Sequence, residues 1–152
     1  MKRARIVFVV ALLTLTNGCN APIAELPGEG LWRFVNYWAI WCGPCREEVP
    51  ILNIIDQRID VQVLGVNFDG VSAEQLADQI TQLGITFSTL SFDPAVLLGK
   101  TTPNLLPTTW LINPKGQVVA TLIGPQTEVS LAQALNNAQH LAVKDAKKTP
   151  AK

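Results

Sequence analysis

The feature that most constrains the fold is a pair of cysteines, Cys42 and Cys45, placed where an apolar run gives way to a helical pattern. The run Trp32–Ala39 is largely apolar and alternates little, which is typical of a strand buried on both faces. After the cysteines, apolar residues recur at helical spacing at Val49, Leu52, Ile55 and Ile59. The sequence therefore predicts a strand, a tight turn that carries both cysteines, and a helix that ends near Arg58–Asp60.

Beyond this helix the chain continues to alternate between strand and helix patterns. Ser72 and Gln75 form a capping-box pattern, and Gly84 is placed to end the helix that they begin. The predicted elements are a strand at Val61–Phe68, a helix at Ser72–Leu83, extended chain at Ile85–Phe92, a short helix at Asp93–Lys100, a hairpin of Thr108–Asn113 with Gln117–Ile123, and an amphipathic helix at Glu128–Val143. This order favours an α/β sandwich whose first two strands are parallel and whose last two are antiparallel.

Residues 1–19 have the pattern of an export signal. Three basic residues within Met1–Arg5 precede the apolar run Ile6–Leu15, which suits a signal segment and is too short to span a bilayer. Leu15–Cys19 resembles the box at which bacterial lipoproteins are cleaved and lipidated, although Thr16 departs from it. We expect a periplasmic protein of the bacterial cell envelope that is anchored to a membrane by a lipid on Cys19. The alternative is an ordinary cleaved signal in which Cys19 is incidental.

The remaining 133 positions divide into three parts. Residues 20–30 hold two Pro and two Gly and are predicted to form a tether, residues 31–143 one domain with a hydrophobic core, and residues 144–152 a disordered, Lys-rich tail. The formal net charge of the chain is zero, but all the basic residues of the signal lie in a segment without acids. The rest of the chain is therefore mildly acidic, which gives no support for nucleic-acid binding.

The two cysteines have the spacing of a dithiol that can close and reopen. A thiolate is the attacking species in disulfide exchange, and the unpaired N–H groups and dipole at the start of a helix lower the pKa of a cysteine there from about 8.5. Cys42, at the first turn, is therefore the expected nucleophile. Cys45, one turn later, is the expected thiol that resolves a mixed disulfide.

Metal binding is the main competing use of such a pair. A structural zinc ion needs four ligands, yet His140 is the single histidine and no second pair of this spacing is present. We therefore expect no metal site and no cofactor. A permanently closed structural disulfide between Cys42 and Cys45 is a further alternative, but so small a ring constrains little of the unfolded chain.

A second informative element is the run Leu106–Ile112, in which Pro107 directly precedes an apolar strand. A proline is tolerated at the first residue of a strand. If the Leu106–Pro107 bond were cis, the backbone of Leu106 would face a neighbouring loop and could accept a peptide-like partner.

Together these motifs resemble the thioredoxin superfamily, through WCGPC, Pro50 in the following helix and a Pro-Thr-Thr strand some sixty residues later. More closely, VNYWAIWCGPCREEVPILN, LGVNFD, GITFSTL, LPTTWLINPKGQVV and the following Gly124-Pro125 are similar to the exported TlpA/ResA branch, over roughly residues 31–140. The resemblance implies a three-layer sandwich with a central mixed sheet and helices on both faces. It also implies a cis Pro107 set against the dithiol.

The same resemblance implies thiol–disulfide exchange outside the cytoplasm, in which client cysteines are kept reduced. Clients in the branch include apocytochromes c and copper-site proteins, and the electrons come from a membrane donor of the DsbD or CcdA kind. Trp41, Gly43, Pro44 and Leu106 are the implied residues flanking the site, whereas Trp38 is expected in the core. The branch usually has an N-terminal hairpin before the first strand, and this chain is shorter there.

Two polar positions refine the expected site. Asn36 stands where cytoplasmic thioredoxins carry a buried Asp, and Glu48 matches a glutamate that tunes thiol pKa in ResA-like members. Glu48 shares a helix face with Cys45, so the two side chains are expected to be close. The alternative is that Glu48 is a solvated helix acid.

Two other functions stay open at this point. One is an oxidase or isomerase of the same fold, which introduces or rearranges disulfides. The other is a non-catalytic copper or haem-assembly chaperone that uses the two cysteines as ligands.

Overall fold

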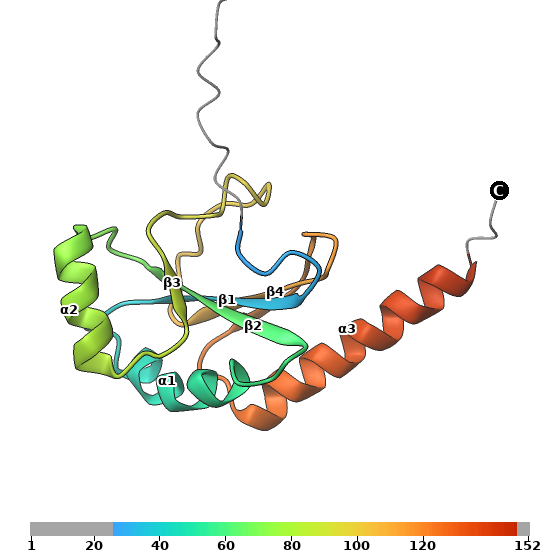
Figure 1. Cartoon of the computed structure of the whole chain (residues 1–152), viewed down its shortest axis with the longest axis horizontal. Helices are drawn as coiled ribbons and strands as arrows, with labels where there is room; N and C mark the ends of the chain where they lie inside the picture. Colours follow the sequence, from blue (N-terminus) through green and yellow to red (C-terminus); the bar gives the residue numbers. More distant parts are fainter. Residues whose placement is uncertain (1–25, 149–152) are drawn as a thin grey trace, which may run out of the picture.

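The computed structural model describes residues 26–148. The predicted signal at 1–19, the lipidated Cys19, the first part of the tether and residues 149–152 lie outside this range. Eight elements follow one another: β1 (Trp32–Trp38), α1 (Gly43–Ile55), β2 (Val61–Asn67), α2 (Ala73–Leu83), β3 (Ser88–Leu90), β4 (Thr108–Ile112), β5 (Val118–Ile123) and α3 (Glu128–Lys148). They form a thioredoxin-like fold around one mixed sheet, as expected (Figure 1).

The five strands lie in the order β3-β2-β1-β4-β5. β1 pairs with β2 in parallel, and β2 pairs in parallel with β3. β4 runs antiparallel to both β1 and β5. The predicted parallel first pair and antiparallel last pair are confirmed. Because β1 lies in the middle of the sheet, the residues that follow it, including both cysteines, leave the sheet at its centre.

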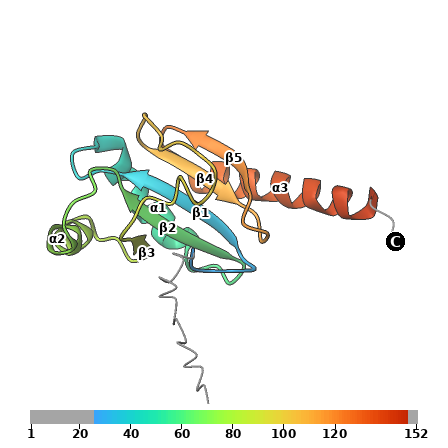
Figure 2. The same cartoon turned by 90° about the horizontal axis from the view of Figure 1, so that it is seen from above.

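One face of the sheet packs against the helices. α1 and α3 lie side by side under the strands, and α2 flanks the sheet beyond β3 (Figures 1 and 2). The core on this side is built from fully buried Phe34 and Leu111 of the sheet, Leu52 of α1, and Leu131 and Leu135 of α3. Each such side chain contributes about 1.5–3 kcal/mol relative to an exposed one. This packing fixes α1, and with it the dithiol, against the sheet.

The other face of the sheet is covered by irregular chain. Val35, Tyr37 and Trp110 form its core, and the side chains that cover them, Leu26, Phe92, Leu98 and Leu106, all lie outside the helices. The helix predicted at Asp93–Lys100 is wrong: this stretch forms successive turns, with Leu98 N donating to Pro94 O at 3.0 Å and Lys100 N to Ala95 O at 2.8 Å. Pro94 and Gly99 leave too few residues between them for a stable helix. The expected layer of helices on this face is therefore replaced by a wrapped segment.

Some element boundaries differ from the prediction. α1 ends at Ile55, because the side chain of Asp56 accepts a hydrogen bond from Val63 N at 2.7 Å and ties the turn to β2. Ile59, expected on the buried helix face, is 97% exposed. Residues 144–148, expected to be disordered, continue α3 as a helix, which extends past the sheet in Figures 1 and 2. The strand at β3 covers only the middle of the extended run Ile85–Phe92.

The predicted second helix is confirmed with its caps. The Ser72 hydroxyl accepts from Gln75 N and the Gln75 side chain accepts from Ser72 N, which completes the capping box. Gly84 ends α2 in the left-handed conformation, with φ 67°. Among the helices of the described region, none combines the length and the apolar character that a membrane crossing needs.

Candidate active site

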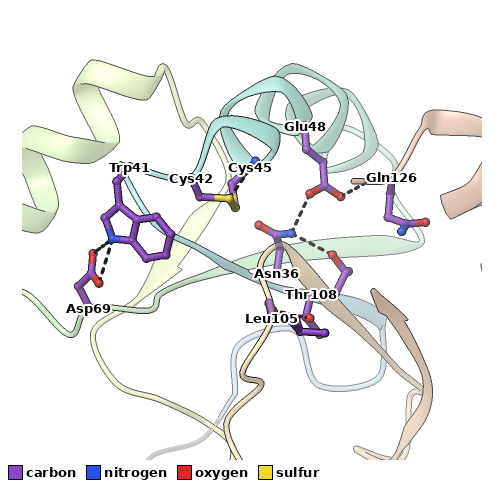
Figure 3. Close-up of a disulfide and its surroundings, with 10 residues drawn as sticks. Asn36, Trp41, Cys42, Cys45, Glu48, Asp69, Leu105, Thr108 and Gln126 are labelled. Carbon is purple, nitrogen blue, oxygen red and sulfur yellow. Dashed lines mark hydrogen bonds between the residues drawn. A yellow bond between two sulfur atoms is a disulfide. The ribbon is translucent and has the colours of Figure 1, made fainter. Parts of the chain in front are cut away.

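Cys42 and Cys45 form a disulfide at the start of α1 (Figure 3). The S–S distance is 2.01 Å and the two Cα atoms are 5.3 Å apart. Cys42 is the N-cap residue of α1 in an extended conformation, and its Sγ accepts a hydrogen bond from Cys45 N at 3.2 Å. Pro44 lies in the first turn, where a missing N–H costs nothing. The helix start therefore presents backbone donors to the sulfur of Cys42, as the sequence predicts.

The surroundings of the disulfide make one side of it accessible. Gly43, Pro44 and Trp41 are exposed, and Trp41 has 64% of its surface free. The two cysteines themselves are buried in the closed ring, Cys42 at 5% and Cys45 at 2% exposure. The exposed surface beside the disulfide is therefore formed by Trp41, Gly43 and Pro44.

Trp41 is held in place by the loop that follows β2. Its indole Nε1 donates to both carboxylate oxygens of Asp69, at 3.0 and 3.2 Å (Figure 3). Phe68 N donates to Trp38 O at 2.8 Å, which closes the same loop onto the end of β1. Trp38 is buried in the core, as expected. Sequence reasoning missed Asp69. Its only signal in the sequence is its position shortly after the predicted strand that pairs with β1, the strand that leads into the cysteines.

Glu48 lies on α1 three residues after Cys45 and is 1% exposed, so it is not a solvated helix acid. Its Oε2 accepts from Asn36 Nδ2 at 3.3 Å and its Oε1 from Gln126 N at 3.2 Å (Figure 3). Burial raises the pKa of Glu48 from 4.5 to about 7, although the donors at Gln126 and Asn36 act in the opposite direction. The carboxyl group therefore exchanges its proton near neutral pH, close to where thiol chemistry operates.

Asn36 is buried in β1 and connects this carboxyl to the neighbouring strand. Its Nδ2 also donates to Thr109 Oγ1 at 2.9 Å, and Thr109 lies opposite Asn36 in the β1–β4 register. An amide at this position offers donors to Glu48 and carries no charge. Gln126 was not predicted, because it acts through its backbone N–H, which no residue type reveals.

The Leu106–Pro107 bond is cis, as the resemblance implies. β4 begins directly after Pro107 and pairs antiparallel with β1, with Thr108 opposite Tyr37. Since β1 leads into the cysteines, this pairing brings the start of β4 to the same end of the sheet as the dithiol. Pro107 O accepts from Gly124 N at 2.9 Å and Thr108 Oγ1 donates to Leu105 O at 2.8 Å, so both sides of the cis bond are fixed.

Comparison with known proteins agrees with this geometry. The sequence model of the AhpC/TSA family matches residues 10–121. Thiol-disulfide oxidoreductase ResA of Bacillus subtilis is 31% identical over 124 residues, which cover 80% of this chain and 68% of that protein. The structure of StoA from Bacillus subtilis is 27% identical, with a TM-score of 0.57 over 70% of this chain and 84% of that one. A secreted thiol-disulfide isomerase of Corynebacterium glutamicum is 26% identical, with a TM-score of 0.59 over 69% and 68%.

A thioredoxin-like fold that carries a CxxC disulfide at the start of a helix defines a thiol–disulfide oxidoreductase. The chain belongs to the AhpC/TSA family, in the thioredoxin-like group that includes the ResA enzymes. It is accordingly an enzyme, and its relatives indicate partners that are proteins carrying disulfides.

Proposed function

We propose that this protein reduces disulfides of client proteins outside the cytoplasm, with Cys42 as nucleophile and Cys45 as resolving thiol. The observation that carries the proposal is the placement of Cys42 as the N-cap of α1, where its sulfur accepts the Cys45 N–H. In the reduced protein the same donors stabilise a Cys42 thiolate.

The reaction consists of two exchanges. The Cys42 thiolate attacks one sulfur of the client disulfide, forms a Cys42–client bond and releases the other client sulfur as a thiolate, which takes up a proton. Cys45 then loses its proton and attacks Cys42 Sγ, which releases the second client sulfur. The client gains two electrons and two protons, and the protein is left with the Cys42–Cys45 disulfide seen here.

Glu48 is proposed to accept the proton that Cys45 must lose. It lies one helical turn beyond Cys45 on α1, it is buried, and its pKa of about 7 permits both protonation states near neutral pH. The hydrogen bonds from Asn36 and Gln126 keep the carboxyl group oriented. Pro107 and the backbone of Leu106 are proposed to position the client chain beside the dithiol.

The sequence and the relatives support a place for the enzyme outside the cytoplasm. The leader at residues 1–19 supports export, Cys19 supports a lipid anchor in the cell envelope, and the matched Corynebacterium isomerase is a secreted protein. In such a compartment the disulfide must be reduced again after each turnover. We assign that step to a membrane dithiol donor of the DsbD or CcdA kind, and the clients to apocytochromes c or copper-site proteins.

A second candidate function is disulfide isomerisation, favoured by the similarity to the secreted isomerase. Isomerisation rearranges the disulfides of a client without net electron transfer, so net reduction of a client disulfide separates the reductase from it, and the reduction potential separates the reductase from an oxidase. A potential near that of thioredoxin, about −270 mV, together with reduction of insulin by the dithiothreitol-recycled protein, supports the reductase. A potential near −120 mV, with oxidation of reduced client peptides, would replace the reductase with an oxidant.

A further inference from the structure

The segment between β3 and β4 exposes two large apolar side chains at one turn, Pro94–Gly99. Within this turn Ala95 is buried and Leu98 packs onto the apolar cluster of the sheet. Val96 and Leu97, which stand between them, have 89% and 46% of their surfaces exposed. Single exposed apolar residues are common on protein surfaces, but two neighbours at the tip of one turn form an apolar protrusion.

Hydrogen bonds fix the conformation of this turn. The carboxylate of Asp93 accepts from the hydroxyl of Tyr37, a buried residue of β1, at 2.6 Å and from Ala95 N at 2.9 Å. Leu98 N donates to Pro94 O at 3.0 Å. The protrusion is therefore built on a turn that is tied to the centre of the sheet.

The protrusion lies on the face of the sheet where the described chain begins. In Figure 1 the segment between β3 and β4 lies on one side of the sheet, and α1 and α3 lie on the other. Leu26 packs onto the same apolar cluster as Leu98, and its carbonyl oxygen accepts from Arg33 Nη1 at 3.3 Å. Residues 20–25 separate Leu26 from Cys19, so the chain between these two residues spans at most about 25 Å. A lipid on Cys19 would therefore keep this face of the sheet close to a bilayer.

The charges of the chain differ between the two sides of the sheet. Residues 86–127, which include the protrusion, contain two lysines, Lys100 and Lys115, and one acid, Asp93. That acid already accepts three hydrogen bonds from its own chain. Residues 41–84, which include α1 and α2, contain seven acidic residues and two arginines. An anionic surface consequently repels the side with these helices more strongly than the side with the protrusion.

We propose that the turn Pro94–Gly99 inserts Val96 and Leu97 into the headgroup region of an anionic lipid bilayer. Lys100 directly follows the turn and is exposed, so its methylene stem can lie along the apolar side chains while its ammonium group meets lipid phosphates. The choice of a bilayer as the occupant rests on the lipid anchor of the proposed function, and on no step of the thiol chemistry. Because α1 lies on the other side of the sheet, the dithiol stays clear of the lipid.

Tryptophan quenching tests the contact directly. The processed full-length protein is reconstituted in vesicles of phosphatidylethanolamine and phosphatidylglycerol, with or without bromine on the acyl chains. Val96→Trp is compared with Val129→Trp, a matched change at a residue of α3 that is 65% exposed on the other side of the sheet. We expect brominated lipid to remove about half or more of the emission that Val96→Trp adds to the wild type, and none of that added by Val129→Trp. Equal quenching of both variants, or quenching of neither, would overturn the proposal.

Hydrogen exchange tests the contact without an added tryptophan. Amide exchange of the processed protein is followed by mass spectrometry in the same vesicles and in detergent. We expect peptides from residues 94–106 to exchange about threefold or more slowly in vesicles, and peptides from α3 to exchange equally in both. Replacing Val96 and Leu97 together by Ser should abolish the difference, whereas Val129→Ser should keep it. Slow exchange of residues 94–106 that appears in detergent and grows with protein concentration would assign the protrusion to a second copy and overturn the proposal.

Two further measurements separate this proposal from the proposed function. The mass of the processed protein shows whether Cys19 carries a lipid. If it does not, the proposed anchor fails, and the quenching of Val96→Trp is measured with vesicles added to the protein, where its absence overturns the contact and its presence supports it. Insulin reduction in detergent should be equal in the wild type and in the protein with Ser at positions 96 and 97. Failure of insulin reduction in the wild type would contradict the reductase alone, because the quenching does not depend on the thiols.

Discussion

The backbone N–H of Gln126, in the turn before α3, donates to Glu48 Oε1 on α1 at 3.2 Å. Two helices that are distant in the sequence thus meet at one buried carboxyl group. Thr127 and Ser130 cap α3 reciprocally, with Ser130 N donating to Thr127 Oγ1 at 3.1 Å and Thr127 N to Ser130 Oγ at 2.9 Å. These capping hydrogen bonds fix the start of α3 independently of Glu48. They therefore help to hold the backbone N–H of Gln126 where it donates to the Glu48 carboxyl group.

Replacing the cysteines separates their roles. Cys42→Ser should abolish disulfide reduction, because the attacking thiolate is lost. Cys45→Ser should instead accumulate mixed disulfides with clients, because resolution is lost. Non-reducing gels of protein incubated with a disulfide client measure both outcomes. Wild-type activity in either variant would contradict the mechanism.

Replacing Glu48 by Gln should alter the pH profile of thiol alkylation in the reduced protein. Ionisation of a buried carboxyl near the thiols disfavours the thiolate, so the wild-type profile should show an inflection near the Glu48 pKa of about 7. Glu48→Gln should lack that inflection and react faster above pH 7. Iodoacetamide labelling between pH 5 and 9 provides the measurement, with Glu47→Gln on the exposed face of α1 as the control. If the pH profiles of labelling coincide for Glu48→Gln and the wild type, Glu48 has only a structural role.

The raised pKa of Glu48 also predicts that the free energy of unfolding changes with pH. Its pKa is raised in the folded state, so the folded protein binds more protons than the unfolded chain between pH 4.5 and about 7. Stability from this group is fully present below pH 4.5 and is lost as the pH rises through 7, by up to about 3 kcal/mol. Chemical denaturation at pH 5 and pH 8 should show this loss in the wild type and a smaller one in Glu48→Gln. An equal pH dependence in both proteins would contradict it.

Asp69→Ala should free Trp41 without unfolding the protein. The hydrogen bonds between them are exposed, so the free energy of unfolding should change by less than about 1 kcal/mol. The Trp41 indole resonance should broaden or shift in ¹H–¹⁵N spectra, and mixed-disulfide formation should slow. Asp78→Ala, an equal charge change on the exposed surface of α2, serves as the matched control. An indole resonance unchanged by Asp69→Ala would show that Asp69 does not hold Trp41.

Gly65→Ala should destabilise the fold by about 1–3 kcal/mol through overpacking. An added Cβ would lie 2.9 Å from Trp38 Nε1, 2.9 Å from Thr89 Oγ1 and 3.0 Å from Phe87 Cε2. These atoms belong to buried or half-buried side chains that cannot easily move aside. Gly43→Ala, where nothing lies within 4 Å, should leave the free energy of unfolding nearly unchanged. Urea denaturation of both variants measures the difference.

Local patterns predicted most of the elements, since apolar periodicity and caps such as Ser72 and Gly84 act over a few residues. The Asp93–Lys100 prediction failed because its apolar residues cover a sheet face without forming a continuous helical stripe.

Of the site residues, Cys42 and Glu48 could be singled out by residue type and spacing. The donor role of Gln126 could not, because a backbone N–H leaves no mark in the sequence.

The antiparallel pairing of β1 with β4 brings together two parts of the site that lie far apart in the sequence. The cysteines follow β1, and the cis peptide bond precedes β4. Under the proposed function, Leu106 and Pro107 position the client beside the dithiol. The β1–β4 pairing would then determine which clients the dithiol meets, because a chain that lacks this pairing would carry the cysteines without the segment proposed to select their partner. Client selectivity in the proposed reductase would therefore depend on completion of the sheet.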